Sequence, residues 1–351
     1  MPEAKRRAPR STDVARLANV SQKTVSRVLN GEPYVSDEVR GRVLAAAREL
    51  GYRRNTAARA LHLGRFHRVG VVSLGSSLYG PSSLLIALER RAREIGYAFS
   101  VVNTLEGEDG GVLRAVETLL EQGVDGIVLS EPIDEGQVLG IDPGVPVLSF
   151  GALPGLDGPR VVITGASGVG MGRLATEHLL GLGHATVWHV AGPERWFAAR
   201  DRARGWREAL AGAGIEAPPP PAGDWSPASG YAAGRVLAAN PEVTAVFVAN
   251  DDMAIGVLRA LAEAGRAVPE EVSVVGVDDI PSAAYLSPPL TTVRQDFHEI
   301  AAYGLDLLVE QMENEPGSAT HDDLPAHLVV RRSTAPPKDR TRQRHEPGGS
   351  S

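Results

Sequence analysis

The sequence predicts a small, all-α domain with a helix-turn-helix, followed by a large α/β core of two lobes with parallel sheets. Residues 1–68 carry a net charge of +9, whereas residues 69–351 carry −16. Three short helical patterns occupy residues 11–51. From residue 69 onward, short apolar runs alternate with helical patterns. This alternation is typical of parallel sheets covered on both faces.

Length and composition narrow the class of protein. At roughly 150 residues per domain, 351 residues allow two or three domains. The absence of cysteine excludes disulfide scaffolds and thiolate zinc sites. The first residues contain no apolar run that could form a signal peptide or a membrane span, so we expect a cytoplasmic protein. A basic head suits a polyanion such as nucleic acid, although an arginine-rich solvated surface would also produce it.

The basic region divides into an arm and three helices. Residues 1–10 are polar and are expected to be flexible. Ser11 or Thr12 can cap a first helix, which ends before a tight turn at Asn19. Ser21 is expected to cap a second helix over residues 22–29, and a third helix is expected from Ser36 to the helix-ending Gly51.

The second helix has one apolar stripe, Val25, Val28 and Leu29, and one polar face. In a helix-turn-helix the second helix enters the major groove. Glutamine suits adenine there, lysine and arginine suit guanine, and hydroxyl or amide groups suit phosphates. The predicted DNA contacts of this region are Gln22, Lys23, Thr24, Ser26, Arg27 and Asn30.

The core is expected to contain eight strands and at least six helices. The strands are expected at 69–74, 98–103, 126–130, 145–150, 161–164, 186–191, 245–249 and 272–277. The helices are expected at 82–95, 111–122, 171–182, 200–213, 253–264 and 297–313. The proline run at 218–221 indicates a surface loop, which leads to a strand or loop at Asp224-Trp225.

The motifs V-S-x-x-T-V-S-R-V-L-N, V-S-x-x-V-R, A-x-x-x-L-G-Y and R-N-x-x-A-R-x-L follow one another within residues 11–70. In this region the chain closely resembles the LacI/GalR family of bacterial transcription regulators. The resemblance implies a repressor that binds a pseudo-palindromic operator as a homodimer, with one DNA-binding headpiece (11–54) on each half-site. It also implies a hinge helix and linker (55–68) that contacts DNA through Asn55, Arg59 and Leu61.

In this family, the leucine at the position of Leu61 enters the minor groove and bends the duplex, which makes binding depend on DNA deformability. A leucine that packs at a domain junction is the alternative. The family often has proline before the position of Asn55, whereas this chain has Arg54. The stiffness of the hinge is therefore an open point.

Residues 69–335 resemble the family's core, a two-lobed fold shared with periplasmic sugar-binding proteins. Its anchors include G-V-D-G-I-V-L-S, E-H-L-L-G-L-G-H, A-N-D-D-M-A-I-G, V-G-V-D-D and T-T-V-R-Q-D-F. Several stretches of this core are especially similar to the lactose repressor. Lobe 1 is expected to comprise about 69–164 and 296–324, and lobe 2 about 165–295 and 325–335. Residues 336–351 lack a heptad pattern and are expected to be a disordered tail, which favours a dimer over a tetramer.

The resemblance implies an effector site between the lobes. Its predicted residues are Leu78, Gly80, Pro81, Leu84, Arg202, Trp225, Asn250, Asp278, Gln295 and Phe297. Arginine and carboxylate side chains suit sugar hydroxyls, and an indole suits the apolar face of a pyranose. For three of these residues a structural role is the alternative: a turn cap for Asp278, plain core for Trp225 and an ion pair for Arg202.

Two departures from the lactose repressor leave the identity of the effector open. Gly151 stands where that protein has an aspartate, and Ser167-Gly168 replaces a polar edge of the pocket. Loss of one carboxylate removes a hydroxyl partner and can change the preferred sugar. We therefore expect a small sugar, of which a galactoside-like one is a candidate, while a purine-type corepressor stays open.

Two other classes of function compete with this interpretation. A transport-system sugar-binding protein would share the core, but the basic headpiece argues against it. An α/β enzyme could use the glycine-rich turn T-G-A-S-G-V-G at 164–170 for a dinucleotide, but the accompanying Tyr-x-x-x-Lys motif is missing. The histidines show no metal spacing and no nucleophile elbow is present. We expect no catalytic residue, no metal and no cofactor.

Overall fold

The computed structural model divides into two compact units, Met1–Phe66 and His67–Ser351. The structure describes residues 9–29, 31–52, 65–104, 110–135, 144–314 and 320–338. The predicted DNA contacts Asn30, Asn55, Arg59 and Leu61 lie outside these ranges, as do most of the predicted hinge and of the tail.

The first unit contains three helices in its described part. They are α1 (Ser11–Ala18), α2 (Gln22–Leu29) and α3 (Asp37–Glu49). Asn19 takes a left-handed conformation, with φ of 52°, in the turn between α1 and α2, as its short polar side chain allows. The apolar side chains that the three helices bury together include Val14, Val25 and Val43. This small core leaves the opposite face of α2 exposed to solvent.

Serine hydroxyls cap the N-termini of the second and third helices. Ser21 Oγ accepts a hydrogen bond from the Thr24 amide at 3.0 Å, and Ser36 Oγ accepts one from the Val39 amide at 3.4 Å. The prediction that Ser11 or Thr12 caps the first helix was wrong. Arg10 precedes this helix, and its amide donates at 2.9 Å to the carboxylate of Asp13 inside the first turn. The helix thus begins one residue before the predicted cap allows, and the Asp13 carboxylate in its first turn bonds back to the amide of the residue at the cap position.

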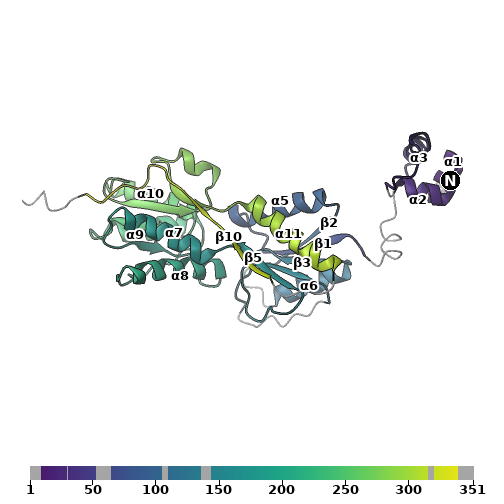
Figure 1. Ribbon diagram of the computed structural model, residues 1–351. Coiled ribbons are helices and arrows are strands. Elements are labelled where there is room, and N and C mark those ends of the chain that lie inside the picture. The colour runs from purple at the N-terminus through teal and green to yellow at the C-terminus, as the bar shows by residue number, and fades with distance from the viewer. Residues whose placement is uncertain are drawn as a thin grey trace, which may run out of the picture. The chain divides into compact units, whose positions relative to one another are not determined.

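The described part of the second unit contains two sheets. The first has the order β10-β5-β4-β3-β1-β2, and all its paired strands are parallel. Its strands are β1 (Arg68–Ser73), β2 (Ala98–Asn103), β3 (Gly126–Leu129), β4 (Val147–Phe150), β5 (Val161–Ala166) and β10 (Thr320–Leu324). Helices α5 (Tyr79–Glu94) and α11 (Phe297–Glu313) pack on one face and α6 (Gly111–Glu121) on the other. This sheet and its helices form lobe 1 (Figure 1).

The second sheet has the order β11-β9-β8-β7-β6, in which only the edge strand β11 is antiparallel. Its strands are β6 (Trp188–Val190), β7 (Ala245–Val248), β8 (Ser273–Val277), β9 (Thr291–Arg294) and β11 (His327–Val329). Helices α7 (Gly168–Gly181) and α8 (Phe197–Gly212) cover one face, and α9 (Pro227–Ala238) and α10 (Asp251–Glu263) cover the other. Together they form lobe 2 (Figure 1). Every residue of β7 and β8 is buried, which explains their continuous apolar runs.

The sequence patterns did not predict three strands and one α-helix of the core, nor the short 3-10 helix at Pro281–Tyr285. β9, β10 and β11 have three to five residues each, and β10 (T-H-D-D-L) is largely polar. α9 reads P-A-S-G-Y-A-A-G-R-V-L-A, whose small residues give a weak apolar stripe. Packing of α9 against α10 and pairing of the edge strands with longer neighbours override these weak local signals.

Three segments connect the lobes: the residues between β5 and α7, between β9 and α11, and between β10 and β11. The glycine-rich turn at 164–170 forms the first of them, so it joins two lobes. A Cβ at Gly172 would lie 2.1 Å from the carbonyl oxygen of Arg202, and one at Gly205 would lie 2.0 Å from that of Val169. Glycines here therefore let α7 and α8 pack in direct backbone contact.

No described helix combines the length and the apolar character that crossing a membrane requires.

Candidate functional site

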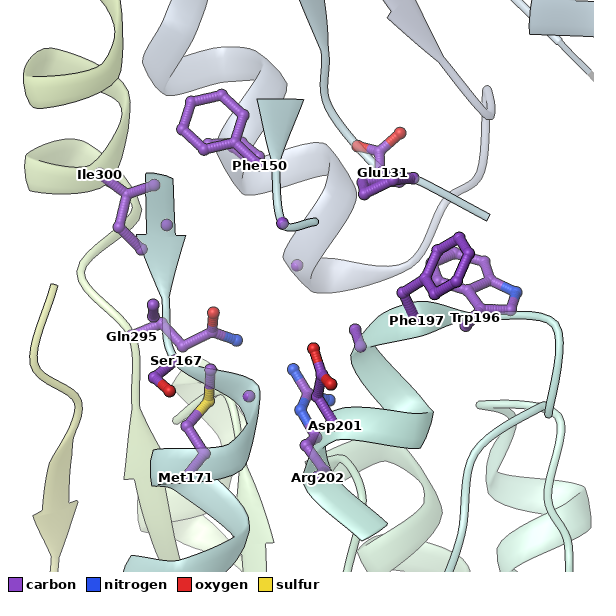
Figure 2. A pocket seen from close by; sticks show the side chains of 18 of the residues that line it. Glu131, Phe150, Ser167, Met171, Trp196, Phe197, Asp201, Arg202, Gln295 and Ile300 are labelled. Carbon is purple, nitrogen blue, oxygen red and sulfur yellow. The ribbon is translucent and has the colours of Figure 1, made fainter. Parts of the chain in front are cut away.

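A cavity of about 360 Å³ lies between the two lobes, where strands of both sheets end (Figure 2). Ligands of open α/β sheets bind beyond the carboxyl ends of the strands, and pockets of roughly 300–1,000 Å³ hold small molecules. All ten residues that were predicted to bind an effector line this cavity. Leu78, Gly80, Pro81 and Leu84 belong to lobe 1, Arg202, Trp225, Asn250 and Asp278 belong to lobe 2, and Gln295 and Phe297 lie where β9 leads into α11.

A buried pair of opposite charges forms the lobe 2 side of the cavity. Arg202 Nη2 lies 3.7 Å from Asp278 Oδ1, and Nη1 donates a hydrogen bond to the carbonyl oxygen of Ala249 at 2.7 Å. Gln295 donates to Asp278 Oδ1 at 2.8 Å. The long arginine-to-aspartate distance is that of an ion pair without a hydrogen bond. The pair therefore has hydrogen-bonding capacity left for a third group.

Burial shifts the pKa of both members of this pair. It raises the pKa of Asp278 to about 6, while Arg202 and the Gln295 hydrogen bond act in the opposite direction. Burial also lowers the pKa of Arg202, and the charge of Asp278 opposes this effect. Asp278 has a φ of 107°, in the left-handed region that costs a non-glycine residue energy. The surrounding contacts must therefore hold this backbone in place.

Trp225 lies beside Arg202 and is itself largely buried. The Arg202 guanidinium carbon is 5.6 Å from the centre of the indole, and the Trp196 ring meets it edge-on with centroids 5.5 Å apart. Only 4% of the Trp225 surface is exposed. Trp225 Nε1 and Arg202 Nε are buried and have no partner among the described residues. Both groups are donors, so an oxygen-rich ligand matches the chemistry of this corner.

Asn250 caps a helix as well as lining the cavity. Its side-chain oxygen accepts a hydrogen bond from the Met253 amide at 2.9 Å and caps α10. Its amide nitrogen donates to the carbonyl oxygen of Trp225 at 3.1 Å. An asparagine amide has two N–H donors, so one donor is left for a ligand. The oxygen is already engaged in the cap, so the second N–H is the group of Asn250 that is left without a bond in the described part of the chain.

The residues predicted on the lobe 1 side of the cavity are apolar. They lie at the start of α5, and Leu84 belongs to the buried core of that lobe. A Cβ at Gly80 would lie 3.6 Å from Phe297 Cζ, so a residue larger than alanine would press on the Phe297 ring. The Tyr79 and Phe297 rings meet edge-on at 6.1 Å. This side offers shape and aromatic surface, and its predicted residues offer no charged group.

Sequence reasoning missed polar residues on the wall. In Figure 2, Asp201 extends from α8 toward the cavity, and its carboxylate pairs with Arg204 at 2.9 Å. Burial raises the pKa of Asp201. The Glu131 carboxylate instead accepts hydrogen bonds from Ser73 Oγ and the Leu74 amide, each at 3.1 Å. Glu131 follows β3 directly, and a charged residue at a strand end was the signal that could have found it.

The two departures from the lactose repressor also lie on the wall of the cavity. Gly151 lines it without a side chain, and Ser167 uses its hydroxyl to cap α7 by accepting from the Gly170 amide at 3.2 Å. Trp196 and Phe197, which were not predicted, line the same cavity. The pocket thus has more aromatic surface than the predicted set suggests.

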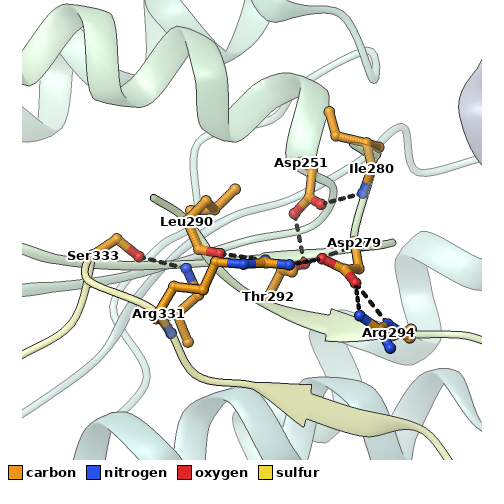
Figure 3. Close-up of polar contacts among 9 residues, drawn as sticks. Asp251, Asp279, Ile280, Leu290, Thr292, Arg294, Arg331 and Ser333 are labelled. Carbon is orange, nitrogen blue, oxygen red and sulfur yellow. Dashed lines mark hydrogen bonds and ion pairs between the residues drawn. The ribbon is translucent and has the colours of Figure 1, made fainter. Parts of the chain in front are cut away.

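A network of ion pairs supports the backbone next to Asp278 (Figure 3). Asp279 accepts hydrogen bonds from Arg294 Nε and from Arg331 Nη2, each at 2.6 Å. Asp251 accepts from Thr292 Oγ1 at 2.7 Å and from the Ile280 amide at 3.0 Å. Arg294 is the last residue of β9, directly before the segment that crosses to lobe 1. The network therefore ties the Asp278 turn to one of the connections between the lobes.

The second candidate site is the exposed face of α2. Gln22 donates to Ser11 Oγ at 2.9 Å, Thr24 bonds the hydroxyl of Ser21 at 2.8 Å, and Arg27 Nε donates to Glu32 at 2.9 Å. Lys23 and Ser26 are exposed on the same helix. The five predicted residues of α2 thus lie away from the small core, as groove contacts require.

Among the described residues, no group of three or more histidine, aspartate or glutamate side chains could hold a metal ion.

Comparisons with known proteins agree with both halves of this description. Residues 12–55 match the bacterial regulatory proteins of the lacI family, and residues 176–334 match a periplasmic binding protein-like domain. The ribose operon repressor of Escherichia coli (strain K12) is 36% identical over 308 residues, which cover 86% of this chain and 92% of that protein. The chain belongs to the lacI family. The family predicted from the headpiece motifs is therefore confirmed.

Other lacI family proteins match over nearly the whole chain. The lactose operon repressor of Escherichia coli (strain K12) is 34% identical over 334 residues, covering 94% of this chain and 91% of that protein. The crystal structure of the lac repressor dimer bound to operator and the anti-inducer ONPF has a TM-score of 0.83 at 32% identity, covering 94% of this chain and all of that one. A CelR–cellobiose complex has a TM-score of 0.70 at 32% identity, with coverages of 93% and 99%. The predicted fold class is confirmed as well.

Proposed function

We propose that this lacI family protein is a sequence-specific repressor whose affinity for operator DNA is controlled by a small sugar bound between the lobes. The observation that carries the proposal is the inter-lobe cavity, which is lined by all ten predicted effector residues in a chain that also has a helix-turn-helix. The related ribose and lactose repressors and the CelR–cellobiose complex support a sugar as the ligand class.

The chemistry of the cavity supports a polyhydroxylated ligand. Arg202 and one N–H of Asn250 supply donors, whereas Asp278 supplies an acceptor. A sugar hydroxyl can both donate and accept, so one ligand can satisfy both kinds of group. Aromatic rings on both sides of the cavity suit the apolar C–H surface of a sugar ring.

The proposed mechanism is coupling between two sites. A sugar that contacts both lobes stabilises one arrangement of the lobes relative to another, because only that arrangement brings all its partners together. The arrangement in turn sets how a homodimer presents its two headpieces to a pseudo-palindromic operator. Such coupling typically amounts to about 1–3 kcal/mol and acts in both directions.

On the DNA side, Gln22, Lys23 and Arg27 are proposed to read base edges, while Thr24 and Ser26 contact phosphates. Outside the described residues, Asn30, Asn55, Arg59 and Leu61 keep their predicted roles in DNA binding. We also propose that the protein has no catalytic activity, needs no cofactor and acts in the cytoplasm at the nucleoid.

The test is DNA binding by the full chain at one fixed salt concentration. Fragments from the neighbourhood of its own gene are compared with shuffled fragments of equal length, with and without ribose, galactosides, glucosides and cellobiose. Specific binding that one sugar releases would establish an inducible repressor. Specific binding that appears only with ligand would make the ligand a corepressor and reverse the proposed direction of control. Equal binding to both kinds of fragment would contradict the proposal.

A further inference from the structure

Arg27 is held by a residue that lies beyond the end of its own helix. It occupies the last turn of α2, and its Nε donates a hydrogen bond to Glu32 Oε2 at 2.9 Å. The side chains of Arg27 and Glu32 are 36% and 43% exposed. The contact therefore lies at the surface of the headpiece, on the helix proposed to enter the major groove.

Glu32 is itself anchored to two helices. Its amide donates to the carbonyl oxygen of Arg27 at 3.1 Å, so a backbone bond and a side-chain bond join the same two residues. Its carbonyl oxygen accepts from Arg40 Nη2, on α3, at 2.9 Å. The Glu32 carboxylate thus projects from a backbone position that both α2 and α3 define.

Glu32 binds the guanidinium of Arg27 through Nε and leaves the two terminal nitrogens available. Neither Nη1 nor Nη2 of Arg27 has a hydrogen bond to a residue in the described part of the chain. Because the guanidinium is planar and its donors form a rigid fork, fixing Nε also fixes the plane and direction of the terminal donors. Two parallel N–H groups of this kind recognise O6 and N7 of guanine.

We propose that Glu32 is a positioning residue that orients Arg27 for recognition of a guanine; this rests on the proposed DNA-binding function of α2. An exposed ion pair adds little to folding stability, so folding alone gives little reason for the contact. Its value lies in ordering a long, flexible side chain before DNA is bound, which lowers the entropy lost on binding.

The negative charge of Glu32 also has a second effect, which lowers DNA affinity and can be distinguished from the positioning of Arg27. A negative charge near the phosphate backbone weakens binding to all DNA sequences alike. Positioning of Arg27, by contrast, changes the ratio of operator affinity to shuffled-DNA affinity. This ratio, the discrimination ratio, is therefore the quantity to measure.

The experiment compares the discrimination ratio of the full-length wild type with those of Glu32→Ala, Arg27→Ala and the double variant at one salt concentration. Glu49→Ala is the matched control, because Glu49 is an exposed glutamate at the end of α3 and its removal changes the headpiece charge equally. We expect Glu32→Ala to lower the ratio about five- to tenfold, the lower part of the range for one bidentate base contact. Glu49→Ala should leave it unchanged, and Glu32→Ala should have no further effect once Arg27 is absent.

Glu32→Gln is a second variant that keeps an oxygen for Arg27 Nε, and we expect an intermediate ratio. Circular dichroism and thermal unfolding confirm that each variant is folded. An unchanged or increased ratio in Glu32→Ala would overturn the positioning role, as would an equal loss in the Arg27→Ala background. A wild type that did not discriminate between operator and shuffled DNA would overturn the proposed function, and the inference with it.

Discussion

The two sides of the inter-lobe cavity are built differently. On the lobe 2 side, Arg202, Asn250 and Asp278 are more than nine-tenths buried, and contacts with neighbouring residues hold each of them. On the lobe 1 side, the predicted residues are an apolar group at the start of one helix, and Gly151 contributes no side chain. The predicted residues of the lobe 2 wall thus offer fixed polar groups and those of the lobe 1 wall offer shape, while the lobe 1 carboxylate of Glu131 is held by Ser73 and Leu74.

This difference predicts different roles for the two walls in ligand binding. Buried polar groups that are already oriented give a ligand strength and strict geometry, because an unmatched partner is costly. Apolar surface discriminates weakly between similar ligands, by about 1–3 kcal/mol for one methylene. We therefore expect substitutions in lobe 2 to abolish the response to sugar and substitutions in lobe 1 to alter the choice of sugar.

The largest expected effect comes from Arg202→Ala. It removes the donor and leaves Asp278 as an uncompensated buried charge, which typically costs about 3–5 kcal/mol. We expect sugar affinity to fall at least about 100-fold and the free energy of unfolding to fall as well. Calorimetric titration with the sugar that releases DNA, together with denaturant unfolding, measures both.

The control for Arg202→Ala is Arg204→Ala, which removes an arginine two residues away on the exposed rim of the cavity. Its effect on sugar affinity should stay below about threefold, as expected for an exposed charge. Wild-type sugar affinity in Arg202→Ala would contradict the division between the walls.

The second prediction concerns pH and Asp278. The folded protein holds the pKa of this carboxyl at about 6, above its ordinary value. An ionised carboxylate accepts hydrogen bonds from sugar hydroxyls, so sugar affinity should fall as the pH drops through about 6. Asp278→Asn should bind sugar weakly at all pH values and lose this component of the pH dependence. A steep fall that persisted in Asp278→Asn would assign the titration to another group.

The raised pKa of Asp278 also affects folding stability, and here a fall in pH is favourable, whereas it lowers sugar affinity. Between the ordinary pKa of an aspartate and about 6, the folded chain binds more protons at Asp278 than the unfolded chain does. The sugar-free protein therefore gains stability from this group as the pH falls through that window. Comparing the pH dependence of unfolding in the wild type and in Asp278→Asn isolates this contribution.

A third, smaller effect is expected behind the lobe 2 wall. Asp279→Asn weakens the ion pairs to Arg294 and Arg331, which brace the backbone next to Asp278 (Figure 3). We expect a loss of about 3 kcal/mol in folding stability and of roughly tenfold in sugar affinity. If affinity were unchanged while stability fell, the network would support the fold without orienting Asp278.

The smallest effect is expected on the lobe 1 wall. Leu78→Ala removes partly buried apolar surface that lines the cavity and also packs against the core of lobe 2. Sugar affinity should fall about tenfold or less, and the order of preference among sugars should change. Titration with the whole sugar panel measures both. A complete loss of response would break the proposed division of roles.

Much of the headpiece could be predicted from the sequence because its signals are local. The second helix begins and ends where its cap and apolar stripe predicted, at Gln22 and Leu29, and Asn19 takes the expected left-handed turn. The contact between Arg27 and Glu32 is close in sequence, yet it was missed because a five-residue separation across a helix end matches no standard spacing of helix pairs.

The cavity combines predicted and unpredicted residues for a physical reason. Residues such as Arg202 and Asp278 belong to motifs of the family, so the resemblance located them. The supporting contacts of Asp279 join residues 15 and 52 positions apart, and only the strand order brings them together. Asn250 shows a further limit, because its helix-capping oxygen is assigned only once the start of α10 is known.

The central claim is that sugar and DNA bind to one coupled system, and its most direct test is reciprocity. Sugar affinity is measured calorimetrically for the free protein and for its complex with operator, and operator affinity is measured with and without saturating sugar. We expect the same factor in both measurements, in the range of about 5- to 150-fold. Equal sugar affinity with and without operator would contradict it, because a sugar that does not distinguish the two states cannot control DNA binding.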